Sequence, residues 1–173
     1  MLSPGNTKAL VNGALAGNPF MARESHRLSL IGAAHRHVAR WLIEHEMDTL
    51  TADRDGLATA VERICQKFFK RLARVSSMAA CQSLLSRAVH IPRLEFPFLE
   101  GVRVGSENGP LVDGLRASLD GVDAVHARAG VEAVLGTFFD LLAAFIGEDI
   151  TLRMLHDVWP ELPTAKSCVT ADV

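Results

Sequence analysis

Residues 131–146 form the most apolar stretch of the chain, and their apolar side chains occupy more than one face of a helix. Only Glu132 and Asp140 interrupt it with charge. A helix that is apolar on several sides has to be buried, either inside its own bundle or against another subunit. Because the stretch is shorter than the roughly 20 residues that a bilayer requires, we expect no membrane span. Its apolar members are Val131, Val134, Leu135, Phe138, Phe139, Leu141, Leu142, Phe145 and Ile146.

Apolar residues also recur at helical spacing along most of the other segments. Between residues 22 and 47, for example, Leu28, Ile31, Val38 and Leu42 fall on one face of a helix. No alternating run of β-branched residues competes with these helical patterns. With 173 residues, 49% of them hydrophobic, the chain has the length and the apolar content for one domain with its own core.

Residues 91–110 interrupt the helical pattern. They hold three prolines and three glycines, which fit neither a long helix nor a central strand. We expect a long connection or a small hairpin there, with Leu94, Phe96, Phe98 and Leu99 packing back on the bundle.

The predicted fold is therefore all-α, a bundle of five or six helices with an irregular middle segment that contains Pro and Gly. We expect an N-terminal arm over residues 1–21, a helical domain over 22–160 and a flexible tail over 161–173. The expected helices are 22–47, a second from a cap at Thr51 or Asp53 to about 75, a third from a cap at Ser76 or Ser77 to 90, 111–119, 122–146 and 148–158.

The cysteines and the N-terminus bear on the compartment. Cys65, Cys81 and Cys168 are widely spaced and contain no CxxC pair, so we interpret them as reduced thiols rather than as a disulfide framework or a structural zinc site. Residues 1–20 have neither the long apolar run nor the basic start of a signal peptide. We expect a soluble, cytoplasmic protein.

The charge of the chain is divided unevenly between its two halves. Residues 1–93 carry 13 Lys or Arg against 7 Asp or Glu, whereas residues 94–173 carry 5 against 13. Such a division favours pairing between the halves within one fold, pairing between protomers, or a basic face for an anionic partner.

A cationic set on the second expected helix is the first candidate binding surface. Its members fall at steps of four, three, one and three residues, which places them together on the solvent side. Three interpretations stay open: pairing with the acidic half, a protein partner, or the phosphates of a nucleic acid. Nucleic acid is the weakest of these, because no helix-turn-helix or aromatic platform lies nearby. The set is Arg63, Lys67, Lys70, Arg71 and Arg74.

Two histidines, His35 and His45, take seam positions on the first expected helix. A buried imidazole can bind a haem iron or a metal, so we name both residues as candidate cofactor ligands. The alternative is that they are core histidines with hydrogen-bond partners. The chain has no HExxH or ExxH pair for a helical metal site, and no motif identifies the cofactor.

Catalytic motifs are missing from the sequence. We find no Gly-x-Ser-x-Gly, no P-loop and no Gly-x-Gly-x-x-Gly, and the Asp53-Arg-Asp-Gly fragment lacks the remaining ligands of a calcium loop. We therefore name no catalytic residue and expect a non-enzymatic domain.

Two short stretches carry a resemblance. Phe96-Pro-Phe-Leu-Glu-Gly-Val102 and Ile146-Gly-Glu-Asp-Ile-Thr-Leu-Arg-Met-Leu-His-Asp-Val-Trp-Pro160 resemble helical modules attached to bacterial sensory and signal-transduction proteins. The resemblance implies a regulatory or dimerising role and transfers no catalytic residue.

Three hypotheses for the function follow. The first is a helical regulatory or protein-interaction domain that self-associates through its last two long helices, with Phe138, Phe139 and Phe145 as contact residues. The second is a sensor that binds haem or a metal through His35 or His45. The third is a nucleic-acid binder that uses the cationic set.

Overall fold

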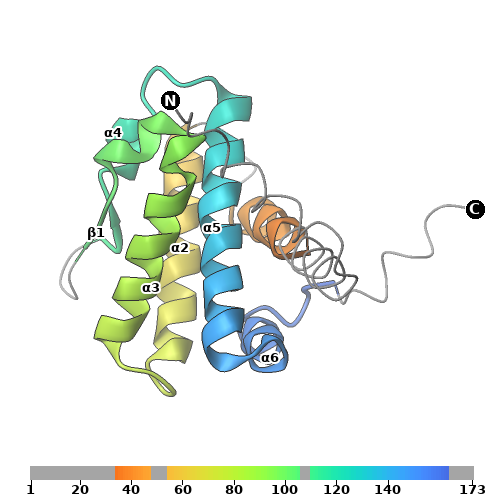
Figure 1. Ribbon diagram of the computed structural model, residues 1–173. Coiled ribbons are helices and arrows are strands. Elements are labelled where there is room, and N and C mark those ends of the chain that lie inside the picture. Colours follow the sequence, from red (N-terminus) through yellow and green to blue (C-terminus); the bar gives the residue numbers. More distant parts are fainter. Residues whose placement is uncertain (1–33, 48–53, 106–109, 164–173) are drawn as a thin grey trace, which may run out of the picture.

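The computed structural model describes residues 34–47, 54–105 and 110–163, and six of its segments are α-helical (Figure 1). The prediction of an all-α fold is confirmed, since the only strands in the described ranges are two residues long each. The expected N-terminal arm, the first half of the helix 22–47, the caps Thr51 and Asp53, and residues 164–173 of the expected tail lie outside the described residues.

The first three helices follow the apolar pattern. Residues 34–46 are helical, α2 spans Arg54–Leu72 and α3 spans Met78–His90. The predicted cap of the third helix is confirmed, because Ser77 has extended backbone and its side chain accepts a hydrogen bond from the amide of Ala80. The second helix ends three residues before the expected position, at Leu72.

The middle segment contains short turns and a small hairpin. Two 3₁₀ helices, η1 (Ile91–Leu94) and η2 (Pro97–Gly101), lead into β1 (Arg103–Val104), which pairs antiparallel with β2 (Val112–Asp113). Of the apolar residues expected to pack back, Phe96 and Leu99 are buried and Phe98 is partly buried, but Leu94 is 97% exposed. The prediction was wrong for Leu94 because the 3₁₀ turn of η1 directs it outwards while Pro92 takes the inner position.

The prediction of a helix over residues 111–119 was also wrong. Its first residues belong to β2, and α4 covers only Leu115–Ser118. Gly114 separates the two with a positive φ of 76°, a conformation that breaks a helix and that glycine adopts readily.

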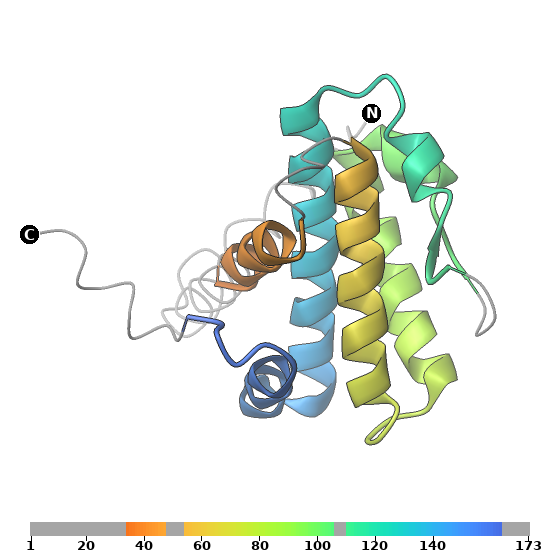
Figure 2. The same ribbon diagram turned by 180° about the vertical axis from the view of Figure 1, so that it is seen from behind.

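α5 (Ala124–Ile146) is the central helix, and α6 (Glu148–Val158) follows it after Gly147. Figures 1 and 2 show α2, α3 and α5 side by side, with the helix 34–46 and α6 lying across them on one side. Asp123 caps α5 by accepting hydrogen bonds from the amides of Val125 and His126.

The core is centred on aromatic rings of α2 and α5. Phe68 meets both Phe138 and Phe139 edge to face, at centroid distances of 6.1 and 5.6 Å. Phe69 stacks on Phe138 at 5.9 Å. Trp159, which follows α6, lies 6.3 Å from the ring of Phe68 and is 3% exposed, so the chain after α6 is part of the same core.

α5 has 23 residues, close to the expected helix 122–146, and within the described ranges it is the one helix long and apolar enough to cross a membrane. Length and composition alone are weak evidence for a span, because the core helix of a soluble protein satisfies the same criteria. In its most apolar window 56% of the residues are buried inside the fold, which is typical of a core helix.

Candidate functional site

His35 is buried, as its seam position predicted, and it joins the helix 34–46 to α5. The residue is 1% exposed, and Nδ1 lies 2.5 Å from Oδ1 of Asp140. Asp140 is half-exposed, so the pair lies at the edge of the core. This contact gives the imidazole a structural partner, and within the described residues no group of three His, Cys, Asp or Glu could hold a metal ion.

His45 is on the surface, so the prediction of a seam position was wrong for this residue. Its side chain is 38% exposed, stacks on Trp41 at 4.6 Å and lies 3.9 Å from a carboxylate oxygen of Glu161. Ten residues of α-helix separate His35 and His45 by about 15 Å along the axis, so the two rings cannot bind one ion together.

Glu46 contacts two members of the cationic set, Lys67 through its buried carboxylate and Arg63 through its backbone oxygen. Its Oε1 accepts from Nζ of Lys67 at 2.5 Å and from the indole N–H of Trp159 at 2.7 Å. Nη1 of Arg63 reaches the backbone oxygen of Glu46 at 3.4 Å. Burial opposes the ionisation of Glu46, but the two hydrogen bonds and the charge of Lys67 outweigh it, and the pKa of this carboxyl lies below its ordinary value.

The other members of the set lie on a shallow groove between α2 and α6. Arg71 forms an ion pair with Asp157 of α6. Lys70 and Arg74 are exposed and have no carboxylate partner within the described ranges. The groove has a volume of about 400 Å³ and includes Lys67, Lys70, Arg71, Arg74, Asp157 and Val158. Lys67 and Arg71 are therefore paired with carboxylates of the same chain, whereas Lys70 and Arg74 are available to a partner.

Of the three phenylalanines expected to contact a partner, two are buried in the core and one is exposed. Phe138 and Phe139 are 2% and 0% exposed inside the core of their own chain, so neither can meet a partner in this fold. That expectation was wrong because α2 supplies Phe68 and Phe69 as partners for both rings. Phe145, in contrast, is 62% exposed near the end of α5.

Glu132, a buried carboxylate, is the centre of an ion network that the sequence did not predict, and its cationic partners extend to the surface. Both of its oxygens accept from Arg40, at 3.0 to 3.2 Å, and Oε1 also accepts from Arg128 at 3.1 Å. Arg128 in turn reaches Glu44 at 2.6 Å. The spacing of four residues between Arg128 and Glu132 is typical of an ion pair on a helix, so this part of the network could have been predicted. The network fixes the helix 34–46 on α5.

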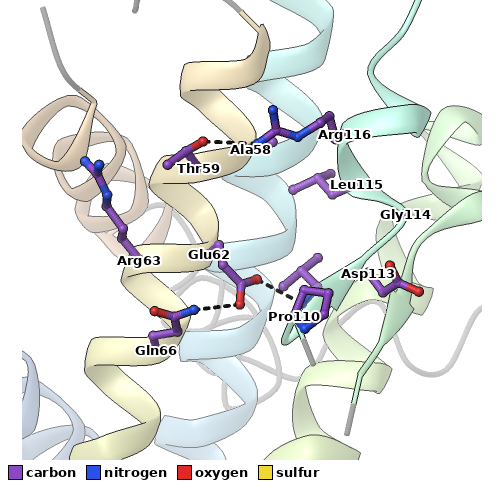
Figure 3. A pocket seen from close by; sticks show the side chains of 11 residues that line it. Ala58, Thr59, Glu62, Arg63, Gln66, Pro110, Asp113, Gly114, Leu115 and Arg116 are labelled. Atoms are coloured by element: carbon purple, nitrogen blue, oxygen red, sulfur yellow. Dashed lines mark hydrogen bonds between the residues drawn. The ribbon is translucent and has the colours of Figure 1, made fainter. Parts of the chain in front are cut away.

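A pocket of about 410 Å³ lies between α2 and the segment from Pro110 to Arg116 (Figure 3). Glu62 is its main acidic group, but its oxygens accept from the amides of Leu111 and Val112 at 2.9 and 3.2 Å and from Gln66. At the other end Arg116 binds Asp55 and Thr59. The polar groups here hold the hairpin and α4 on α2, which indicates a structural role.

Comparison of the chain with protein-family models, with curated proteins and with solved structures finds no match. The geometry of the described residues is therefore the basis for assigning a function. Among the groups left without a partner within the described residues are Lys70 in the last turn of α2, Arg74 just after that helix, and exposed apolar side chains near the junction of α5 and α6.

Proposed function

We propose that this chain is a helical regulatory domain of the signalling type that self-associates through one end of its bundle. The observation that carries the proposal is the exposure of Phe145 and Ile150, at 62% and 49%, on either side of the α5–α6 junction. We call these two residues the junction patch. The resemblance of the sequence to helical modules of bacterial sensory proteins supports the regulatory part of the proposal.

Unpaired charges of both signs lie at the same end of the bundle as the junction patch. Glu148 and Asp149 occupy the first turn of α6, are exposed, and have no cationic partner within the described residues. The last turn of α2, with Lys70, and the turn after it, with Arg74, lie at this end as well (Figures 1 and 2).

These charges favour a second copy of the chain as the partner that binds the junction patch. In a two-fold symmetric dimer the same surface is used by both copies, so a surface with both acids and cations can be complementary to itself. The junction patch would supply the apolar centre of such an interface, and the charges would form its polar rim.

Substitution of Phe145 tests the proposal. We expect sedimentation velocity to show a dimer of the wild-type chain and a monomer of Phe145→Asp, because the side chain is exposed and its replacement leaves the core intact. The matched control is Val125→Asp, since Val125 is 80% exposed at the opposite end of α5. A monomeric wild-type protein at micromolar concentration contradicts the proposal, as does equal dissociation of the control variant.

A charge exchange tests the orientation of the dimer. Lys70→Glu combined with Arg74→Glu should weaken the dimer, and adding Glu148→Lys and Asp149→Lys should restore it. If the fourfold variant is as weak as the twofold one, the acids and the cations do not meet across the interface.

A further inference from the structure

A groove of about 720 Å³ lies between α3 and the hairpin. Figure 1 shows the hairpin on the side of α3 that faces away from α5. The lining residues of the groove include no Asp or Glu. The groups that can interact with a ligand come from about two turns of α3 and from η1. They are Ser83, Ser86, Arg87, His90 and Arg93. A cavity with this lining attracts negative charge.

Arg93 is the least compensated of these groups. Its Nη2 donates to the backbone oxygen of Val102 at 2.7 Å and its Nη1 lies 3.5 Å from Nδ1 of His90. Its Nε is buried and has no hydrogen-bond partner in the described part of the chain. A guanidinium is always charged, so a half-buried one without a carboxylate partner in the described residues lacks a counter-ion.

The other donors of the groove fit a tetrahedral oxyanion. Arg87 is exposed one turn before His90 and has no carboxylate partner within the described residues. The hydroxyl groups of Ser83 and Ser86 lie on the same face of α3. Phosphate oxygens accept from several directions at once, and the planar fork of arginine matches them well.

We propose that this groove binds a small ligand that carries phosphate, such as a phosphomonoester or a diphosphate, with Arg87 and Arg93 as its charged contacts. The site is separate from the junction patch, so it neither requires nor excludes self-association.

Calorimetric titration of the full chain with inorganic pyrophosphate, at an ionic strength held constant with potassium chloride, tests the proposal. We expect saturable binding at one site per chain. Arg87→Gln should weaken it by about tenfold or more, because hydrogen bonds to charged groups contribute about 1.5–3 kcal/mol. Since Arg87 is exposed, this variant leaves the fold intact. Arg93→Lys, which keeps the charge and loses the planar fork, should also weaken binding.

Two controls make the result specific. Arg153→Gln removes one exposed cation from α6, and it should leave the affinity within about twofold if the groove is the site. Succinate tests whether the preference is for phosphate, and it should bind at least about tenfold more weakly than pyrophosphate. Absence of saturable binding, an equal loss in Arg153→Gln, or equal affinity for succinate would overturn the proposal.

Discussion

The indole N–H of Trp159 donates to Oε1 of Glu46 over 2.7 Å, although the two residues are 113 positions apart in the sequence. The same oxygen accepts from Nζ of Lys67 at 2.5 Å. One buried carboxylate thus joins the helix 34–46, α2 and the segment that follows α6. Because Trp159 also lies against Phe68, the hydrogen bond and the ring contact hold this segment to the core together.

Replacing Trp159 with Phe keeps an aromatic ring in the core and removes the donor to Glu46. We expect the free energy of unfolding to fall by about 2 kcal/mol, since the lost hydrogen bond is to a charged group. Urea unfolding at pH 7 measures it. The control is Trp41→Phe, because Trp41 is partly buried and stacks on His45, and we expect a loss below about 1 kcal/mol. Equal losses would show that the Glu46 contact contributes nothing specific.

The lowered pKa of Glu46 predicts a pH dependence of stability. The ordinary value for this group is 4.5 and the folded state lowers it, so the ionised form stabilises the fold above pH 4.5. That contribution is lost as the pH falls through the folded-state pKa. Glu46→Gln should therefore unfold at lower urea than the wild type at pH 7, and the difference should narrow below pH 4.5. A difference that stays constant with pH contradicts this assignment.

The helices could be predicted because their signals are local. The cap at Ser77 and the end of the long helix at Ile146 are set by a few neighbouring residues, and both are confirmed. The helix expected over 111–119 was wrong because its first amides bind Glu62, which is 49 and 50 positions away. A contact of that range leaves no periodic signal in the sequence.

The candidate site was harder to predict than the helices, because its chemistry depends on pairing. Four members of the cationic set lie on α2 and Arg74 follows just after it, but the sequence does not show that the carboxylate of Glu46 binds Lys67 and that Asp157 pairs with Arg71. Helical spacing also does not distinguish a ring at the end of a bundle from one inside it. Phe138 and Phe145 are seven residues apart on α5, yet the first is buried and the second exposed.

The buried thiol of Cys65 should be inert in the folded protein. Burial raises its pKa to about 12, so almost no thiolate exists at pH 8. Burial raises the pKa of Cys81 as well. The experiment uses a Cys168→Ser variant, which removes the cysteine outside the described residues. At pH 8 no thiol of the folded variant should react rapidly with a disulfide reagent, and two thiols should react after urea is added. A fast phase in the absence of urea would show that one of these cysteines is accessible.

Two glycines with nearly the same backbone conformation separate the effect of conformation from that of close packing. Gly114 and Gly121 have φ values of 76° and 78°. A Cβ at Gly121 would meet nothing within 4 Å, whereas one at Gly114 would lie 2.7 Å from the backbone oxygen of Gly101. Gly121→Ala should therefore lower the free energy of unfolding only by the cost of the left-handed conformation, about 1–2 kcal/mol. Gly114→Ala should cost more, because the oxygen belongs to the backbone of η2 and cannot move without shifting that turn. Urea unfolding of the two variants measures the difference, and equal losses would mean that the α4–η2 contact is looser than the structure shows.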